Sequence, residues 1–271
     1  MNLRARDFAG PAWRFLRSEA PSLARLGAPA VLVMLAGGWL PGLAGADYRV
    51  VVSLSNLVAA VVMLQFARVV YGGLAAGLPP RPADLLRIDG LTWSIAWRSV
   101  AMGILVGLPA GIAVVVAFVV SLGAAFGSSS SSGIEWLIWI IVLPALWLSL
   151  WLALRLVPVP ILAVAPALRL APVGPFGTAW ALSRGRTWLL FKLLFLTVAP
   201  FALPAALLPW SFRLGGAFSL ATALAVGVLI TALQLAIIAI SGHALVALTR
   251  ALRAAVAAAP RSAPAAPPAS P

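Results

Sequence analysis

The chain has 271 residues, of which 63% are hydrophobic and only 9% are charged. Because a soluble domain is about 45–50% apolar and about 25% charged, this composition excludes an ordinary water-soluble protein. The 19 basic residues outnumber the six acidic residues and give a net charge of +13, which in a soluble protein would indicate nucleic-acid binding. In so apolar a chain, the excess is typical of basic loops that stay on one side of a membrane, and we expect no nucleic-acid partner.

The residue types also limit the chemistry that the chain can perform. The sequence contains no cysteine, which excludes disulfides, thiolate nucleophiles and cysteine-ligated metals. His243 is the single histidine, so a metal site with several histidines is excluded as well. We therefore predict no catalytic, cofactor-binding or metal-binding residues.

Residues 1–26 form a basic segment that we expect to be an amphipathic helix at the inner membrane interface. At 100° per residue its apolar side chains share one side, namely Phe8, Ala12, Phe15, Leu16 and Leu23. Arg14, Arg17 and Arg25 lie on the other side, and we expect Arg14 and Arg17 to contact anionic lipid head groups. The alternative is a partly ordered basic tail.

Residues 27–249 contain six apolar stretches, each long enough to cross a membrane, since about 20 helical residues span its hydrocarbon core. They cover residues 27–46, 50–71, 100–126, 134–157, 188–209 and 217–248. Prolines interrupt the first stretch, and three more in the fifth predict a kink or a broken outer half there. The predicted fold class is an all-α integral membrane bundle of six transmembrane helices with kinked spans.

The first stretch also has features of a cleavable signal peptide. Apolar residues 28–40 precede the small residues 44–46, which fit a cleavage site before Asp47. We favour a membrane span because the basic segment before it is long for a signal peptide and contains Asp7 and Glu19.

The distribution of charge predicts the orientation of the chain. Seventeen basic residues fall on the side of the two termini, and only Arg49 and Arg213 fall on the other. Since basic loops stay in the cytoplasm, we place both termini there. The strong preference for Arg over Lys and the many Ala residues are typical of a bacterial sequence, which indicates the bacterial inner membrane. Residues 254–271 are rich in Ala and Pro and are expected to be disordered.

Few polar residues lie at membrane depth. Asn56, Gln65 and Gln234 are candidates for an intramembrane polar path, although hydrogen bonds between helices explain them equally well. No acidic residue lies centrally in a span, which argues against ion coupling and acid–base catalysis.

Two patterns predict how helices associate. Gly103, Gly107 and Gly111 form a repeated small-xxx-small ridge, and we expect it to pack against another helix of the same chain rather than in a dimer. Arg155 follows Trp151 by four residues, so a cation–π contact is one reading. We favour the alternative, in which Arg155 extends to the interface at the end of the helix.

Residues 155–195 contain Pro160, Pro166, the segment 179–182 and then Ser183-Arg184-Gly185-Arg186 before Trp188. This pattern resembles the membrane-domain group associated with glycerophosphoryl diester phosphodiesterases. It departs from that group at residues 169–172, where an acidic residue is often found, and the phosphodiesterase domain has no counterpart in these residues. The resemblance implies a helical membrane module and assigns no catalytic residue. We expect Arg184 and Arg186 to contact phosphates at the inner surface.

These observations favour a non-enzymatic inner-membrane protein, namely a scaffold, an assembly factor or a subunit of a membrane complex. Its expected partners are membrane lipids with anionic inner-leaflet head groups and proteins of such a complex. The alternative is a transporter or permease for small molecules or lipids, and an embedded lipid-modifying enzyme ranks below both.

Overall fold

Long helices make up the chain, as its continuous apolar stretches predict. The computed structural model describes residues 3–44, 48–126, 132–170, 173–214 and 220–258, and within these ranges it contains helices and no strand. The six long helices of these ranges are α1 (Ala5–Ala44), α2 (Tyr48–Ala76), α3 (Gly90–Phe126), α4 (Ser132–Leu156), α7 (Thr187–Leu214) and α8 (Leu220–Ala258). Shorter connecting helices are η1 (Pro82–Leu86), α5 (Val159–Val164), η2 (Pro166–Leu168) and α6 (Pro175–Ser183).

Five segments among the described residues are long and apolar enough to cross a membrane. They are Leu57–Ala76, Gly90–Leu122, Ile138–Val164, Thr187–Ala205 and Ala225–Val256. The fold is therefore all-α with the character of a membrane protein. α1 is not among the five, although it contains the first predicted span. α7 is a continuous helix through its three prolines, so its outer half is not broken.

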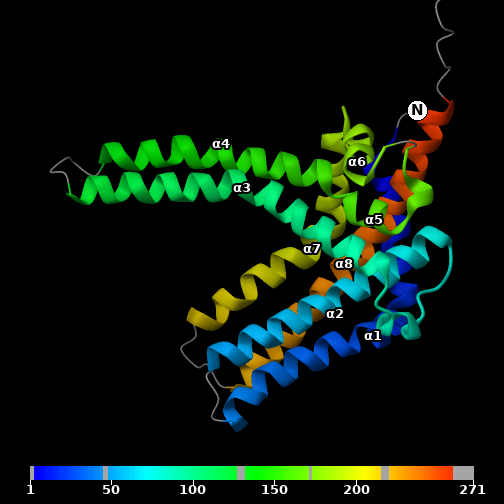
Figure 1. Cartoon of the computed structure of the whole chain (residues 1–271), viewed down its shortest axis with the longest axis horizontal. Helices are drawn as coiled ribbons and strands as arrows, with labels where there is room; N and C mark the ends of the chain where they lie inside the picture. The colour runs from blue at the N-terminus through cyan, green and yellow to red at the C-terminus, as the bar shows by residue number, and fades with distance from the viewer. Residues whose placement is uncertain (1–2, 45–47, 127–131, 171–172, 215–219, 259–271) are drawn as a thin grey trace, which may run out of the picture.

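Figure 1 shows two parts of unequal packing. α1, α2, α7 and α8 run together as a bundle, and α3 and α4 form a hairpin that extends away from it. We call the outer part of this hairpin, residues 103–126 and 132–148, the arm. The arm packs α3 against α4, while the hairpin contacts the rest of the chain through α5, α6, α7 and α2.

The buried core lies at the end of the molecule where α1 begins and α8 ends. Its fully buried side chains come from several helices, including Ala12, Leu162, Leu182, Leu193 and Ile240. α5 is the most enclosed element, since five of its six residues are buried. Tight packing at this end positions the polar groups that surround it.

The amphipathic segment before the first span is helical, as predicted, but it is part of a larger element. α1 runs without a break from Ala5 to Ala44, so no helix end marks the boundary expected at residue 26. Its apolar residues Phe8, Ala12 and Leu23 are buried, and α1 packs on α7 and α8. The apolar face is thus covered by protein, because the neighbouring helices offer it a core.

Close helix approaches occur at glycines other than those of the predicted ridge. A Cβ added at Gly242 would lie 2.5 Å from Tyr71 Cε1, where α8 meets α2. At Gly103, Gly107 and Gly111 an added Cβ would meet nothing within 4 Å. The expectation that this ridge packs within the chain is therefore wrong for the described residues. The period of the small residues marks one face of α3, but that face turns away from α4 and α5.

We expect Gly242→Ala to destabilise the fold, because its methyl group would overlap the ring of Tyr71. Overpacking of this kind costs about 1–3 kcal/mol. The measurement is thermal unfolding of the purified protein in detergent. Gly107→Ala is the matched control, since it adds the same methyl group to open space and should change stability by no more than about 0.5 kcal/mol. Equal losses in both variants would contradict this packing.

Candidate functional site

Arg68 is a buried arginine that joins α2 to the connection before α3. Its side chain is only 7% exposed. Arg68 Nε donates to Gln65 Oε1 at 2.9 Å, Nη1 donates to Asp89 Oδ2 at 2.9 Å, and Nη2 donates to the backbone oxygen of Asp84. Gln65 Nε2 in turn donates to Thr92 Oγ1 at 3.3 Å. Every partner belongs to the chain itself, so this cluster holds α2, η1 and α3 together.

Asp89 has a second role as the residue before the first turn of α3. Its Oδ1 accepts hydrogen bonds from the backbone N–H groups of Leu91 at 3.1 Å and Thr92 at 3.0 Å, which is the geometry of an N-cap. Burial opposes ionisation of this carboxyl group, but the Thr92 N–H, the charge of Arg68 and the remaining hydrogen bonds outweigh it and hold the Asp89 pKa below its usual value of 3.8. Asp89 is therefore a charged structural link.

Arg155 lies between two tryptophan rings. Its Cζ is 4.3 Å from the ring centroid of Trp151 and 4.3 Å from that of Trp180. The two rings are nearly perpendicular, with centroids 5.4 Å apart. The cation–π reading is thus the one that the structure shows, and Trp180 on α6 is a partner that the helical spacing of α4 does not reveal. The contact fixes α6 against the end of α4.

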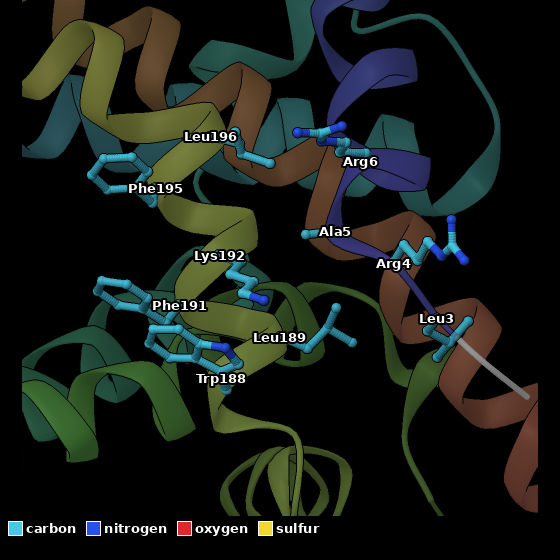
Figure 2. Close-up of a pocket in the computed structure, with 10 residues that line it drawn as sticks. All are labelled: Leu3, Arg4, Ala5, Arg6, Trp188, Leu189, Phe191, Lys192, Phe195 and Leu196. Carbon is cyan, nitrogen blue, oxygen red and sulfur yellow. The ribbon is translucent and has the colours of Figure 1, made fainter.

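A basic groove lies between the first residues of α1 and the first turns of α7. Its volume is about 690 Å³, and Arg4, Arg6 and Lys192 contribute its charge. Figure 2 shows Lys192 directed from α7 into the space in front of the start of α1. The remaining lining residues are apolar: Leu3, Ala5, Trp188, Leu189, Phe191, Phe195 and Leu196. We name this feature the basic groove.

The basic residues predicted to contact lipid lie outside this groove. Arg14, Arg17 and Arg184 are exposed, on α1 and in the turn after α6. Arg186 donates from Nη1 to the backbone oxygen of Leu182 at 3.3 Å. Sequence reasoning counted Arg4, Arg6 and Lys192 only as topological charge. The spacing of Trp188 and Lys192, one helical turn apart, was the available signal, but nothing in the sequence pairs α7 with residues 3–6.

The predicted polar path does not assemble among the described residues. Gln65 is committed to the Arg68 cluster, and Gln234 is exposed on α8. The side chain of Asn56 lies outside the described residues. The hydroxyl groups of Thr231 and Ser241 donate to backbone oxygens one turn back in α8, at 2.8 Å and 2.6 Å. Hydrogen bonding within and between helices accounts for Gln65, Thr231 and Ser241.

His243 is a packing residue of the bundle. Its ring stacks on Phe15 of α1 with centroids 4.8 Å apart. Within the described ranges, no group of three or more His, Asp or Glu side chains lies close enough together to hold a metal ion. The polar chemistry of the molecule is therefore concentrated in its basic residues.

Comparison with known proteins finds no matching family model, no matching curated protein and no matching solved structure. The resemblance of residues 155–195 to the phosphodiesterase-associated membrane group accordingly stays a prediction. The geometry of the chain itself has to support any assignment of function.

Replacing Arg68 with Gln should destabilise the protein by about 3 kcal/mol, because it leaves a partly buried carboxylate and a buried amide without their partner. Arg87→Gln is the matched control. Arg87 Nε lies 3.7 Å from the same Asp89 carboxylate but is 74% exposed, so its loss should cost less than about 1 kcal/mol. Chemical unfolding in detergent measures both. Similar losses in the two variants would contradict a buried link at Arg68.

The contribution of Asp89 to the stability of the fold should depend on pH. Because its pKa is lowered in the folded protein, its charged form stabilises the fold above pH 3.8, and this contribution is lost as the pH falls further through the lowered value. We expect the difference in unfolding temperature between the wild type and Asp89→Asn to be constant from pH 7 to 5 and to shrink below pH 4. Asn preserves the N-cap acceptor, so the variant tests the charge of Asp89 and its Oδ2 contact with Arg68. A difference that grows at low pH would contradict the assignment.

Proposed function

We propose that the protein is a non-enzymatic, six-span protein of the bacterial cytoplasmic membrane that acts as a scaffold, an assembly factor or a subunit of a membrane complex. Five apolar helices support the membrane setting. The sixth span of this proposal is the apolar stretch 27–46, whose described part lies in α1. The sequence assigns seventeen basic residues to the side of the two termini, and α1 begins and α8 ends at the same end of the bundle (Figure 1), which supports cytoplasmic termini.

The observation that carries this proposal is the exposure of the arm. Only 6% of the apolar window in α3 is buried, compared with 44% in α2 and 39% in α8. The arm also carries the glycine ridge at 103, 107 and 111 on an open face. Lipid can cover apolar side chains, but a ridge of small residues allows the close backbone approach by which membrane helices associate. The arm therefore offers a helical partner a surface that the rest of the chain leaves uncovered.

The transporter alternative receives less support. A path for a polar substrate requires polar groups that converge at membrane depth. Gln65 hydrogen bonds within the Arg68 cluster, and Gln234 faces outward from the bundle. These positions favour a structural role for both residues.

Photocrosslinking in native membranes tests the proposal. We expect benzoylphenylalanine at Ile112, which is 56% exposed on the arm, to form protein adducts because a partner helix covers this face. The same group at Leu207, which is 63% exposed on α7, should form mainly lipid adducts. Gel electrophoresis and mass spectrometry identify the products.

Lipid adducts alone at both positions would contradict a scaffold that acts through the arm. Flux of a small solute into vesicles that contain only this chain would then favour the transporter. The chain has no cysteine, so a labelling cysteine introduced at either position would give an independent measure of accessibility.

A further inference from the structure

The basic groove between α1 and α7 has the composition of a binding site for an amphipathic anion. We propose that it binds the phosphate-bearing head group of one anionic lipid of the inner leaflet. This inference rests on the proposed position of this end of the bundle at the inner membrane surface. It differs from a general attraction of basic residues to the membrane, because it assigns one lipid to one defined groove.

The charge of the groove is of one sign. Arg4, Arg6 and Lys192 line it, and no carboxylate is among its lining residues. Within the described residues, none of these three cations forms an ion pair, whereas Arg68 and Arg87 both do. α7 also begins beside the groove, so its first backbone N–H groups add positive potential, whereas at the start of α1 the backbone N–H of Arg4 already donates to Asp7 Oδ2 at 3.2 Å. A bound phosphate would relieve the repulsion among these like charges.

The apolar part of the groove explains why a lipid is favoured over a free phosphate. Trp188, Phe191 and Phe195 form a continuous aromatic row along α7, with ring centroids 5.1 Å and 6.2 Å apart. Trp188 and Phe195 are more than half exposed, and the row extends about 10 Å along the helix axis. Tryptophan at this depth is typical of the membrane interface. The row gives the acyl chains an apolar surface along α7 beside Lys192, on the side of α7 away from the start of α1 (Figure 2).

The groove is a product of the fold and its width is fixed. Trp13 Nε1 donates to the backbone oxygen of Leu196 at 3.2 Å, and the Trp13 ring stacks on Phe201 at 5.2 Å. These contacts hold α1 against α7 beside the groove. Lys192 Nζ lies 5.2 Å from the Trp188 ring centroid, which keeps the ammonium group at the border between the charged and aromatic parts. The volume of about 690 Å³ falls within the range of roughly 300–1,000 Å³ found for small-molecule sites.

Native mass spectrometry of the full chain, released from nanodiscs with equal parts phosphatidylglycerol and phosphatidylcholine, tests the proposal. We expect the wild type to retain one phosphatidylglycerol and no phosphatidylcholine. The variant Arg4→Gln/Arg6→Gln/Lys192→Gln should bind phosphatidylglycerol on the order of 100-fold more weakly, about fivefold for each cation removed. The single charge reversal Lys192→Glu, at an exposed side chain, should also weaken the retention of phosphatidylglycerol.

The matched control is Arg14→Gln/Arg17→Gln/Arg25→Gln, which removes three exposed cations of α1 outside the groove. It should retain the lipid within about twofold of the wild type, because these three side chains do not line the groove and act on a lipid there only through the screened surface potential. Equal losses in the control and the groove variant would overturn the proposal, as would undiminished retention in the groove variant. Circular dichroism confirms that each variant is folded.

Competition with inorganic phosphate distinguishes a lipid phosphate from a free phosphate ion as the ligand of the groove. Millimolar phosphate should leave the lipid bound, since it gains nothing from the aromatic row. Complete displacement by phosphate would assign the groove to a soluble anion and overturn the lipid. If the groove variants retain the lipid as well as the wild type does, the crosslinking result at the arm is still unaffected. A chain that does not enter nanodiscs at all would instead refute the membrane setting itself.

Discussion

Arginine side chains that donate to backbone oxygens hold together the end of the molecule where α1 begins and α8 ends. Arg250 of α8 donates to the oxygens of Leu74 and Ala75 at 2.9 Å and 2.7 Å, at the end of α2. Arg169 donates to Leu162 and Ala163 in the same way at the end of α5, at 2.7 Å and 2.9 Å. The last carbonyls of a helix have no partner within it, and leaving them unpaired near lipid is costly. Guanidinium groups supply the missing donors and connect elements distant in sequence.

This constraint gives the basic excess a second meaning. Several of the basic residues from which the orientation of the chain is predicted also complete its helix ends, and a planar guanidinium with five donors is better suited to this than a lysine ammonium group. Arg253 likewise donates to Ala167, and Arg68 donates to Asp84. Lys192, the one lysine, lies in the basic groove beside an aromatic ring and has no backbone oxygen to satisfy among its contacts in the described residues. The groove is thus lined by basic side chains that form no ion pair among the described residues.

Sequence reasoning predicted the features that depend on local pattern and missed those that depend on partners. The described part of each predicted span falls within one long helix, to within one residue at the end of α4, because continuous apolar residues demand a helical backbone in lipid. The ridge at Gly103 shows the limit, since its spacing identifies a face but not what covers it. Trp180 lies 25 residues after Arg155, so their contact requires the turn through α5 and α6. The basic groove likewise requires residues 4 and 192 to meet, which no periodicity indicates.

The two open surfaces of the molecule differ in what they can accept. The end where α1 begins and α8 ends combines the groove with a packed core. A ligand in the groove therefore meets a preformed site, and its binding costs little conformational entropy of the protein. The arm has no such core and contacts the remaining chain mainly near its base. A helical partner on the arm would supply packing that the chain lacks, and would do so without touching the groove, because α3 and α4 contribute no residue to it. Lipid at the groove and protein at the arm can therefore be bound by one copy at the same time.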